Sequence, residues 1–360
     1  MKGPGRILLV FLLLAGCAKE PAPESSLGAL SDPPEGFRQA EPGMTVKLPE
    51  DMGPHPEYRL EWWYLTANLQ SAEGERFGVQ WTLFRSGIRP GPFQEKAPGW
   101  KRNEIWLAHA ALSRPQEHHF ADRAARGGTA QAGVEVSPFK AWIDHWELES
   151  LDAETWQLVV DEGDFRYRLK IQPQRPVVLN GDGGFSAKSS AGGGSMYFSY
   201  PLQVTEGEIQ IGDSVYAVTG QGWFDREWSS QYLKPEQEGW DWMALHLDDG
   251  RHLMLFRVRG LEDFYSATLV AADGTSRALD AEEFSMHPVQ LRKSRFGEVP
   301  VAWGVKVPSV QLNLLVRSWP GDYWNPGTLR YWEGPVLVGG SHTGEGYLEM
   351  TGYEDDGSGT

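Results

Sequence analysis

The chain has 360 residues, of which 40% are hydrophobic and 23% charged, and its formal net charge at pH 7 is −16. This composition excludes general disorder, and the length favours two domains. Phosphate binding relies on Lys and Arg, so the acidic balance argues against a nucleic-acid partner. The 16 Trp, 42 Gly and 24 Pro favour an all-β fold that is rich in turns.

Residues 1–17 have the pattern of a secretory signal. Two positive charges precede the uncharged apolar stretch 7–15, and Leu14-Ala15-Gly16-Cys17 follows it. This ending resembles a bacterial lipobox, which implies that Cys17 is lipidated and becomes the first mature residue. The alternative is a plain signal peptide that contains Cys17, the one cysteine of the chain, by coincidence.

The residue after the cysteine is Ala18 and not Asp. In a Gram-negative cell this implies that the lipoprotein is sorted to the outer membrane and faces the periplasm. Residues 18–56 contain repeated Pro and Glu and few large apolar side chains. This composition predicts an extended tether between the lipid anchor and the folded part of the chain. No later stretch is long and apolar enough for a spanning helix.

From Arg59 onward, short β-rich runs alternate with turn signals. Runs 59–70 and 76–86 predict a hairpin. Segments 114–138 and 173–195 are expected to be loops, and 279–287 is the one short stretch with helical character. Further strands are predicted at 103–113, 139–149, 155–161, 164–172, 196–204, 207–211, 214–220, 240–247, 252–259, 264–271, 300–307, 309–317, 328–338 and 345–352.

An internal repeat divides these strands into two sets. Trp63-Tyr64-Leu65 and Trp242-Met243-Ala244-Leu245 each open a hairpin, and each half closes on a strand that ends in Thr-Gly, at Gly220 and at Gly352. Similar features in the same order suggest duplication, although generic hairpins can also resemble each other by chance. We expect domains at 57–231 and 235–354, built as two tandem lipocalin-like antiparallel β-barrels. Such a barrel can hold a small apolar ligand inside.

Several separated motifs between residues 57 and 353 resemble the carotenoid 1,2-hydratase-like family, which includes AttH-like secreted proteins. They are Glu61-Trp62-Trp63-Tyr64, Gln80 to Arg85, Leu179 to Gly184, Trp223-Phe224-Asp225-Arg226-Glu227-Trp228, Gly239 to Trp242 and Gly346 to Tyr353. The resemblance implies two lipocalin-like domains. The resemblance also implies that the chain is related to carotenoid and phytoalexin hydratases and to enzymes that catalyse cycloadditions. Other relatives are bacterial lipoproteins. Some of these lipoproteins are predicted hydrolases, and some are encoded beside ABC transporters. One departure is Arg226, which stands where the family motif has His.

The segment 223–242 contains the strongest candidates for chemistry. Along an extended strand, Trp223, Asp225 and Glu227 share one face. A carboxyl group beside Trp is desolvated, so its pKa rises and it can donate a proton near neutral pH. Protonation of an alkene by Asp225 would leave a cation that Trp223, Trp240 and Trp242 stabilise through their π-faces, while Asp241 or Glu227 orients water. Alternatively, these acids form structural ion pairs with Arg226 or Arg257.

Other candidates are weaker. Trp62, Tyr64 and Trp228 are candidate ligand contacts, and Glu61 either caps an interface or faces the cavity, whereas Trp63 is expected in the core. His109 is either a general base in the cavity or a buried structural histidine.

We expect no cofactor and no metal site. The nine His are scattered, and His118-His119 is expected in a solvent-facing loop. The glycine-rich stretch 181–194 lacks phosphate-loop spacing, and no Gly-x-Ser-x-Gly motif supports a serine hydrolase.

Two functions remain open. The first is a cofactor-free hydratase, isomerase or hydrolase that acts on an apolar, unsaturated or lipid-like molecule. The second is a non-catalytic carrier that binds such a molecule beside the membrane and exchanges it with an ABC-type transporter.

Overall fold

The computed structural model describes residues 35–90 and 103–355, except 175, 191, 231, 232, 235 and 328. The expected signal segment, including Cys17, lies outside these residues. The described part of the chain consists of two antiparallel β-sheets and contains no α-helix. It has no helix with the length and apolar character required to cross a membrane.

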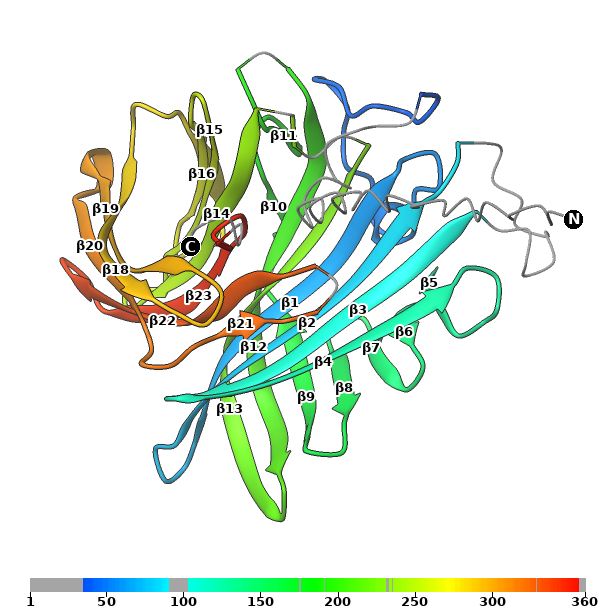
Figure 1. The fold of residues 1–360 in the computed structure, drawn as a ribbon, viewed down its shortest axis with the longest axis horizontal. Coiled ribbons are helices and arrows are strands. Elements are labelled where there is room, and N and C mark those ends of the chain that lie inside the picture. The colour runs from blue at the N-terminus through cyan, green and yellow to red at the C-terminus, as the bar shows by residue number, and fades with distance from the viewer. Residues whose placement is uncertain are drawn as a thin grey trace, which may run out of the picture.

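The first sheet has thirteen strands in the order β4-β3-β2-β1-β13-β12-β9-β8-β7-β6-β5, with β10 and β11 paired to β12. It curls into a nearly closed barrel (Figure 1). The strands are β1 (Leu60–Ser71), β2 (Arg76–Gly87), β3 (Glu104–Arg114), β4 (Glu117–Arg126), β5 (Ala132–Val136), β6 (Phe139–Ile143), β7 (Trp146–Ser150), β8 (Trp156–Asp161), β9 (Phe165–Pro173), β10 (Val178–Leu179), β11 (Phe185–Ala187), β12 (Gly194–Ile211) and β13 (Ser214–Ser229).

The second sheet has ten strands in the order β17-β16-β15-β14-β23-β22-β20-β19-β18, with β21 paired to β22. It forms a half-barrel beside the first (Figure 1). The strands are β14 (Gln237–Leu247), β15 (His252–Gly260), β16 (Phe264–Val270), β17 (Ser276–Leu279), β18 (Ser285–Lys293), β19 (Glu298–Val307), β20 (Leu312–Ser318), β21 (Trp324–Asn325), β22 (Tyr331–Gly340) and β23 (Gly344–Met350); the short 3₁₀ turns are η1 (Glu50–Met52) and η3 (Pro308–Val310).

The two sheets repeat one strand order, since β4-β3-β2-β1-β13-β12-β9 in the first corresponds to β17-β16-β15-β14-β23-β22-β20 in the second. The all-β prediction with two lipocalin-like barrels is confirmed. The proposed match of Trp63 to Trp242 is wrong in register, because Trp63 packs inside the first barrel and Trp242 packs outside the second.

Alternation along the strands separates three apolar cores. Trp63, Leu65 and other inward side chains fill the first barrel, and Met243, Leu245 and their neighbours fill the second. The outward face of β1, which includes Tyr64, packs against the outward face of β14, which includes Trp242, and forms a third core between the barrels. Because successive side chains of a strand point to opposite faces, each of these strands contributes to two cores.

Three local predictions are wrong. Residues 279–287 form no helix, because β17 ends at Leu279 and β18 begins at Ser285, with a turn between them in which the Glu283 carboxylate accepts from the Asp280 backbone N–H. The expected loop 114–138 contains β4 and β5, and 173–195 contains β10 and β11. β4 is a half-exposed edge strand with many polar side chains, so its sequence lacks a strong apolar alternation.

The segment 35–56 also differs from the expected tether. Ala40 and Met52 belong to the core of the first barrel. The Met52 carbonyl accepts a hydrogen bond from Trp63 Nε1 at 2.7 Å, and the Gly53 carbonyl accepts one from Arg226 Nη2 at 2.5 Å. The packed part of the chain therefore begins before residue 57, because these few apolar side chains and carbonyls complete the barrel end.

Candidate functional site

A pocket of about 230 Å³ lies between the two barrels. This volume is just below the ~300–1,000 Å³ of most small-molecule sites, so a bound molecule would be small. Much of the wall is apolar and comes from both barrels. The apolar lining residues are Leu60, Trp62, Tyr64, Phe84, Leu107, Trp240, Trp242, Phe256 and Leu329.

The pocket is formed by the outward faces of strands whose inward faces build the barrels. Aromatic side chains at Trp62 and Tyr64 of β1 oppose those at Trp240 and Trp242 of β14, and the rings of Tyr64 and Trp242 meet edge to face with centroids 5.2 Å apart. The sequence allowed a ligand inside a barrel, whereas this pocket lies at the junction of the two barrels, and the barrel interiors hold packed apolar side chains.

Asp225 lines this pocket from β13. As predicted, Trp223 lies on the same outward face, whereas Phe224 and Trp228 pack inside the barrel. Asp225 Oδ1 accepts hydrogen bonds from Ser199 Oγ at 2.5 Å and Trp223 Nε1 at 2.7 Å. Burial raises the pKa of Asp225 to about 7, although these hydrogen bonds favour the charged form. The carboxyl group can therefore hold or release a proton near neutral pH.

Tyr197 connects Asp225 to the second barrel. Its hydroxyl donates to Asp225 Oδ2 at 2.8 Å and accepts from Trp242 Nε1 at 3.1 Å. Burial and the nearby Asp225 carboxylate raise the pKa of Tyr197 well above its usual value, so the phenol stays protonated. Asp225 thus receives three donors, and one of them is itself positioned by the opposite barrel.

The second barrel contributes a carboxyl group of its own. Glu349 of β23 lines the pocket, and its Oε1 accepts from Trp240 Nε1 at 2.6 Å. Burial raises the pKa of Glu349 to about 7. Its cross-strand neighbour is Glu333 of β22, which accepts from Tyr64 Oη at 2.5 Å and from Asn325 Nδ2 at 3.1 Å. Burial and the facing Glu349 raise the pKa of Glu333 well above its usual range.

Glu227, the third predicted carboxyl group on β13, also lines the pocket but is paired. Lys188 Nζ lies 2.9 Å from Glu227 Oε1, and Ser195 Oγ donates to the same oxygen. The Lys188 ammonium also lies 4.1 Å from the ring centroid of Phe256. Glu227 therefore forms an ion pair at the edge of the pocket, and its partner is neither Arg226 nor Arg257.

His109 of β3, predicted as either a general base in the cavity or a buried structural histidine, lies in the pocket wall. It lines the pocket and is buried, with Nδ1 at 2.9 Å from the hydroxyl of Tyr331 in a shared hydrogen bond. Burial lowers the pKa of His109 to about 4, so the ring is neutral at neutral pH. The neutral imidazole and the Tyr331 hydroxyl add a polar contact to the pocket wall, which the Asp225 and Glu349 carboxyl groups also line.

Three candidates do not line the pocket. Asp241 lies on the inward face of β14, with its Oδ2 at 3.4 Å from Arg257 Nη1 and 3.5 Å from Arg259 Nε, as the ion-pair alternative expected for Arg257. Trp228 stacks on His55 inside the first barrel, with ring centroids 4.0 Å apart. Trp223 contacts Asp225 outside the pocket lining, through the hydrogen bond from its Nε1. These placements follow from strand alternation and exclude Asp241 from orienting water in the pocket.

Arg226, the departure from the family motif, also faces the interior of the first barrel. Its Nη2 lies 2.5 Å from Glu61 Oε2, and Arg85 Nη1 lies 2.9 Å from Glu61 Oε1. The Arg226 guanidinium also lies 3.9 Å from the ring centroid of Trp63. The Glu61 side chain therefore belongs to this buried ion cluster, although Glu61 also borders the pocket. Arg85 also forms an ion pair with Glu104.

Sequence reasoning missed Tyr197, Tyr331, Glu333 and Glu349. Glu349 had a local signal, because it is the one charged residue at 346–352 and alternates with the inward-facing Leu348 and Met350. The contacts of the other three depend on strand pairing and barrel packing between distant segments, so no local pattern marks them.

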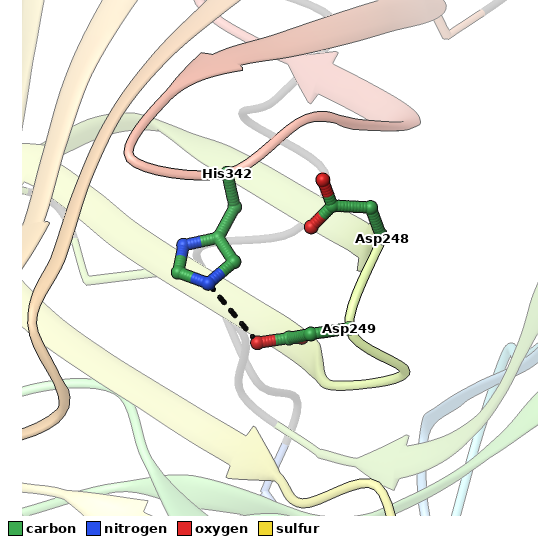
Figure 2. A group of neighbouring side chains, drawn as sticks. All are labelled: Asp248, Asp249 and His342. Atoms are coloured by element: carbon green, nitrogen blue, oxygen red, sulfur yellow. Dashed lines mark ion pairs between the residues drawn. The ribbon is translucent and has the colours of Figure 1, made fainter.

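One group in the described part of the chain has a composition that could hold a metal ion, namely Asp248, Asp249 and His342. Figure 2 shows His342 Nε2 directed at Asp249 Oδ2, at 3.1 Å. Arg251 lies 2.6 Å from the same carboxylate, and Asp248 Oδ2 accepts from Thr343 Oγ1 at 2.7 Å. These contacts and the adjacent positive charge make the group a poor cation site. His118 was expected in a solvent-facing loop. It lies in β4, and its Nε2 forms a hydrogen bond with Asn325 Oδ1.

Comparison with known proteins identifies the class to which this fold and site belong. The AttH-like family model matches residues 39–353. A crystal structure from Nitrosomonas europaea described as an AttH protein shares 32% identity, with a TM-score of 0.76 over 88% of this chain and 100% of that one. The chain belongs to the AttH-like family.

Two more distant structures share the fold. Kievitone hydratase from Nectria haematococca has 14% identity and a TM-score of 0.64 over 89% of this chain and 98% of that one. CghA, determined with Sch210972, has 12% identity and a TM-score of 0.50 over 83% of this chain and 89% of that one. A search of curated proteins found no match.

Proposed function

We propose that this protein catalyses addition or removal of water at a carbon–carbon double bond of a small apolar molecule bound between the barrels. The observation that carries the proposal is Asp225, a buried carboxyl group with a pKa near 7 in the wall of an aromatic pocket. The shared fold with kievitone hydratase, an enzyme named for hydration, supports this reaction class.

The chemistry follows from the pocket. Protonated Asp225 gives its proton to one alkene carbon and becomes a carboxylate, and the second carbon becomes cationic. The rings of Tyr64, Trp240 and Trp242 can stabilise that cation, since an aromatic face attracts positive charge by ~0.5–2 kcal/mol. Water then adds to the cation and releases a proton. The same steps in reverse describe dehydration.

The test uses 4-vinylphenol, a small aromatic alkene, incubated with the protein in D₂O. We expect deuterium at the terminal vinyl carbon, detected by mass spectrometry, because protonation there is reversible. Asp225→Asn should lower the rate of incorporation by ~10²–10⁴-fold, the usual contribution of a general acid. Asp122→Asn, an exposed aspartate of β4, is the control and should exchange at the wild-type rate.

The apolar lining also supports a second candidate, a carrier that binds an apolar molecule without altering it and exchanges it with an ABC-type transporter near the membrane to which Cys17 would anchor the chain. A carrier predicts that 4-vinylphenol binds equally to the wild type and to Asp225→Asn and that neither incorporates deuterium. Native mass spectrometry of protein purified from the periplasm, followed by organic extraction, would identify the retained molecule in either case.

A further inference from the structure

The pocket contains two carboxyl groups at equivalent positions in the repeated strand order. On the outward face of the first barrel, Asp225 of β13 pairs in register with Tyr64 of β1. On the outward face of the second barrel, Glu349 of β23 pairs with Trp242 of β14. Tyr64 and Trp242 touch across the junction. The repeat therefore places one carboxyl group from each barrel in the wall of a single pocket.

The two carboxyl groups have different surroundings. Both oxygens of Asp225 already accept hydrogen bonds, from Ser199, Trp223 and Tyr197. Glu349 accepts a hydrogen bond from Trp240 Nε1 at its Oε1, and among the described residues no donor reaches its Oε2. This second oxygen can accept a hydrogen bond from a water molecule in the pocket.

The residue that pairs with each carboxyl residue on the next strand also differs. Ser199 of β12 lies opposite Asp225, whereas Glu333 of β22 lies opposite Glu349. Two buried carboxyl groups this close cannot both be charged. Glu333 lies outside the pocket lining, and its two oxygens accept hydrogen bonds from Tyr64 and Asn325, whereas Glu349 lines the pocket. Glu349 is therefore the member of the pair that a water molecule in the pocket can reach.

We propose that Glu349 binds the attacking water and takes its proton, while Asp225 on the opposite barrel protonates the alkene. This assignment rests on the proposed function. In the step, Asp225 gives its proton to carbon and a C–H bond forms; the water oxygen forms a C–O bond to the cationic carbon; and the proton that leaves the water moves to the Glu349 carboxylate. Asp225 ends as a carboxylate and Glu349 as an acid, and exchange with solvent restores both.

The experiment separates the two proton transfers. With 4-vinylphenol in D₂O enriched in ¹⁸O, deuterium in the recovered alkene reports protonation by Asp225, and ¹⁸O in the alcohol product reports addition of water. We expect Glu349→Gln to lower ¹⁸O incorporation by ~100-fold or more while deuterium exchange persists, because the cation can return its proton to Asp225. Glu345→Gln is the matched control, since it changes the same residue type on the same face of β23 outside the pocket lining.

If Glu349→Gln still incorporates ¹⁸O, the assignment of Glu349 as the base is wrong. If the variant loses both deuterium exchange and ¹⁸O incorporation, Glu349 acts in protonation of the alkene, and the assignment is also wrong. Absence of both labels in the wild type counts against the proposed function. A second measurement then judges Glu349 by itself: ¹³C NMR titration of carboxyl-labelled Glu. A signal that titrates near pH 7, shifts when 4-vinylphenol binds and disappears in Glu349→Gln supports the assignment; titration in the ordinary range with no response to 4-vinylphenol overturns it.

Discussion

Asp225 and Arg226 are consecutive residues of β13, yet they lie in opposite kinds of environment. Arg226 points into the first barrel and forms an ion pair with Glu61, where burial alone would raise the Glu61 pKa but Arg226 and Arg85 hold it well below its usual range. Asp225 points into the junction pocket, where no described cation forms an ion pair with it and burial raises its pKa to about 7. The comparison teaches that two neighbouring, equally buried sites can shift the pKa of a carboxyl group in opposite directions, because close guanidinium groups stabilise the Glu61 carboxylate and none contacts Asp225.

The largest effect is expected from breaking the interior pair. Arg226→Met leaves the Glu61 carboxylate buried with one fewer partner, and removal of one member of a buried ion pair destabilises a protein by ~3–5 kcal/mol. Urea unfolding at pH 7 measures this loss. Asp225→Asn is the neighbouring control and should not lower stability at that pH, since it removes an uncompensated buried carboxyl group. Equal stability of Arg226→Met and the wild type would show that the cluster is not structural.

The pH dependence of stability sharpens the same comparison. Asp225 has a pKa near 7 when folded and an ordinary value of 3.8, so between these values the native state binds more protons than the unfolded state. Stability from this group is therefore full below about pH 4 and falls as the pH rises to 7, by up to ~4 kcal/mol. Urea unfolding from pH 4 to pH 8 should show a shallower decline in Asp225→Asn. Parallel curves for the two proteins would contradict the raised pKa.

A smaller effect distinguishes the two tryptophans that sequence reasoning assigned to one ligand site. Trp242 lines the pocket and donates to Tyr197, whereas Trp228 packs on His55 inside the first barrel. Trp242→Phe should weaken 4-vinylphenol binding by about 1 kcal/mol, roughly fivefold. Trp228→Phe should leave binding unchanged and lower stability by ~0.5–3 kcal/mol. Isothermal titration and urea unfolding measure the two; weaker binding in Trp228→Phe alone would reverse the assignment.

Much of this arrangement was accessible from the sequence because strand alternation is a local property. It correctly placed Trp223 and Asp225 on one face of a strand and Phe224 on the other, and it identified Trp63 as a core residue. The polar edge strand β4 was not predicted, because its half-exposed positions show no apolar alternation.

Contacts between residues far apart in the sequence could not be obtained in this way. The ion pair of Arg226 with Glu61 and the contact of Tyr64 with Glu333 join residues that are 165 and 269 positions apart. Such contacts depend on how the sheets close and pack, which no sequence window of strand length contains. For the same reason, the sequence left open whether the barrels are hollow and did not indicate the pocket between them.

The pocket is lined mainly by outward positions of strands whose inward positions hold the barrels together. Along β1, for example, Trp62 and Tyr64 contact the pocket, whereas Trp63 and Leu65 build the core. During evolution, selection for fold and selection for chemistry therefore act on alternate residues of one segment. Substitutions that reshape the pocket therefore fall mostly on every second position of a strand, and the positions between them, which fill the barrel, can stay the same.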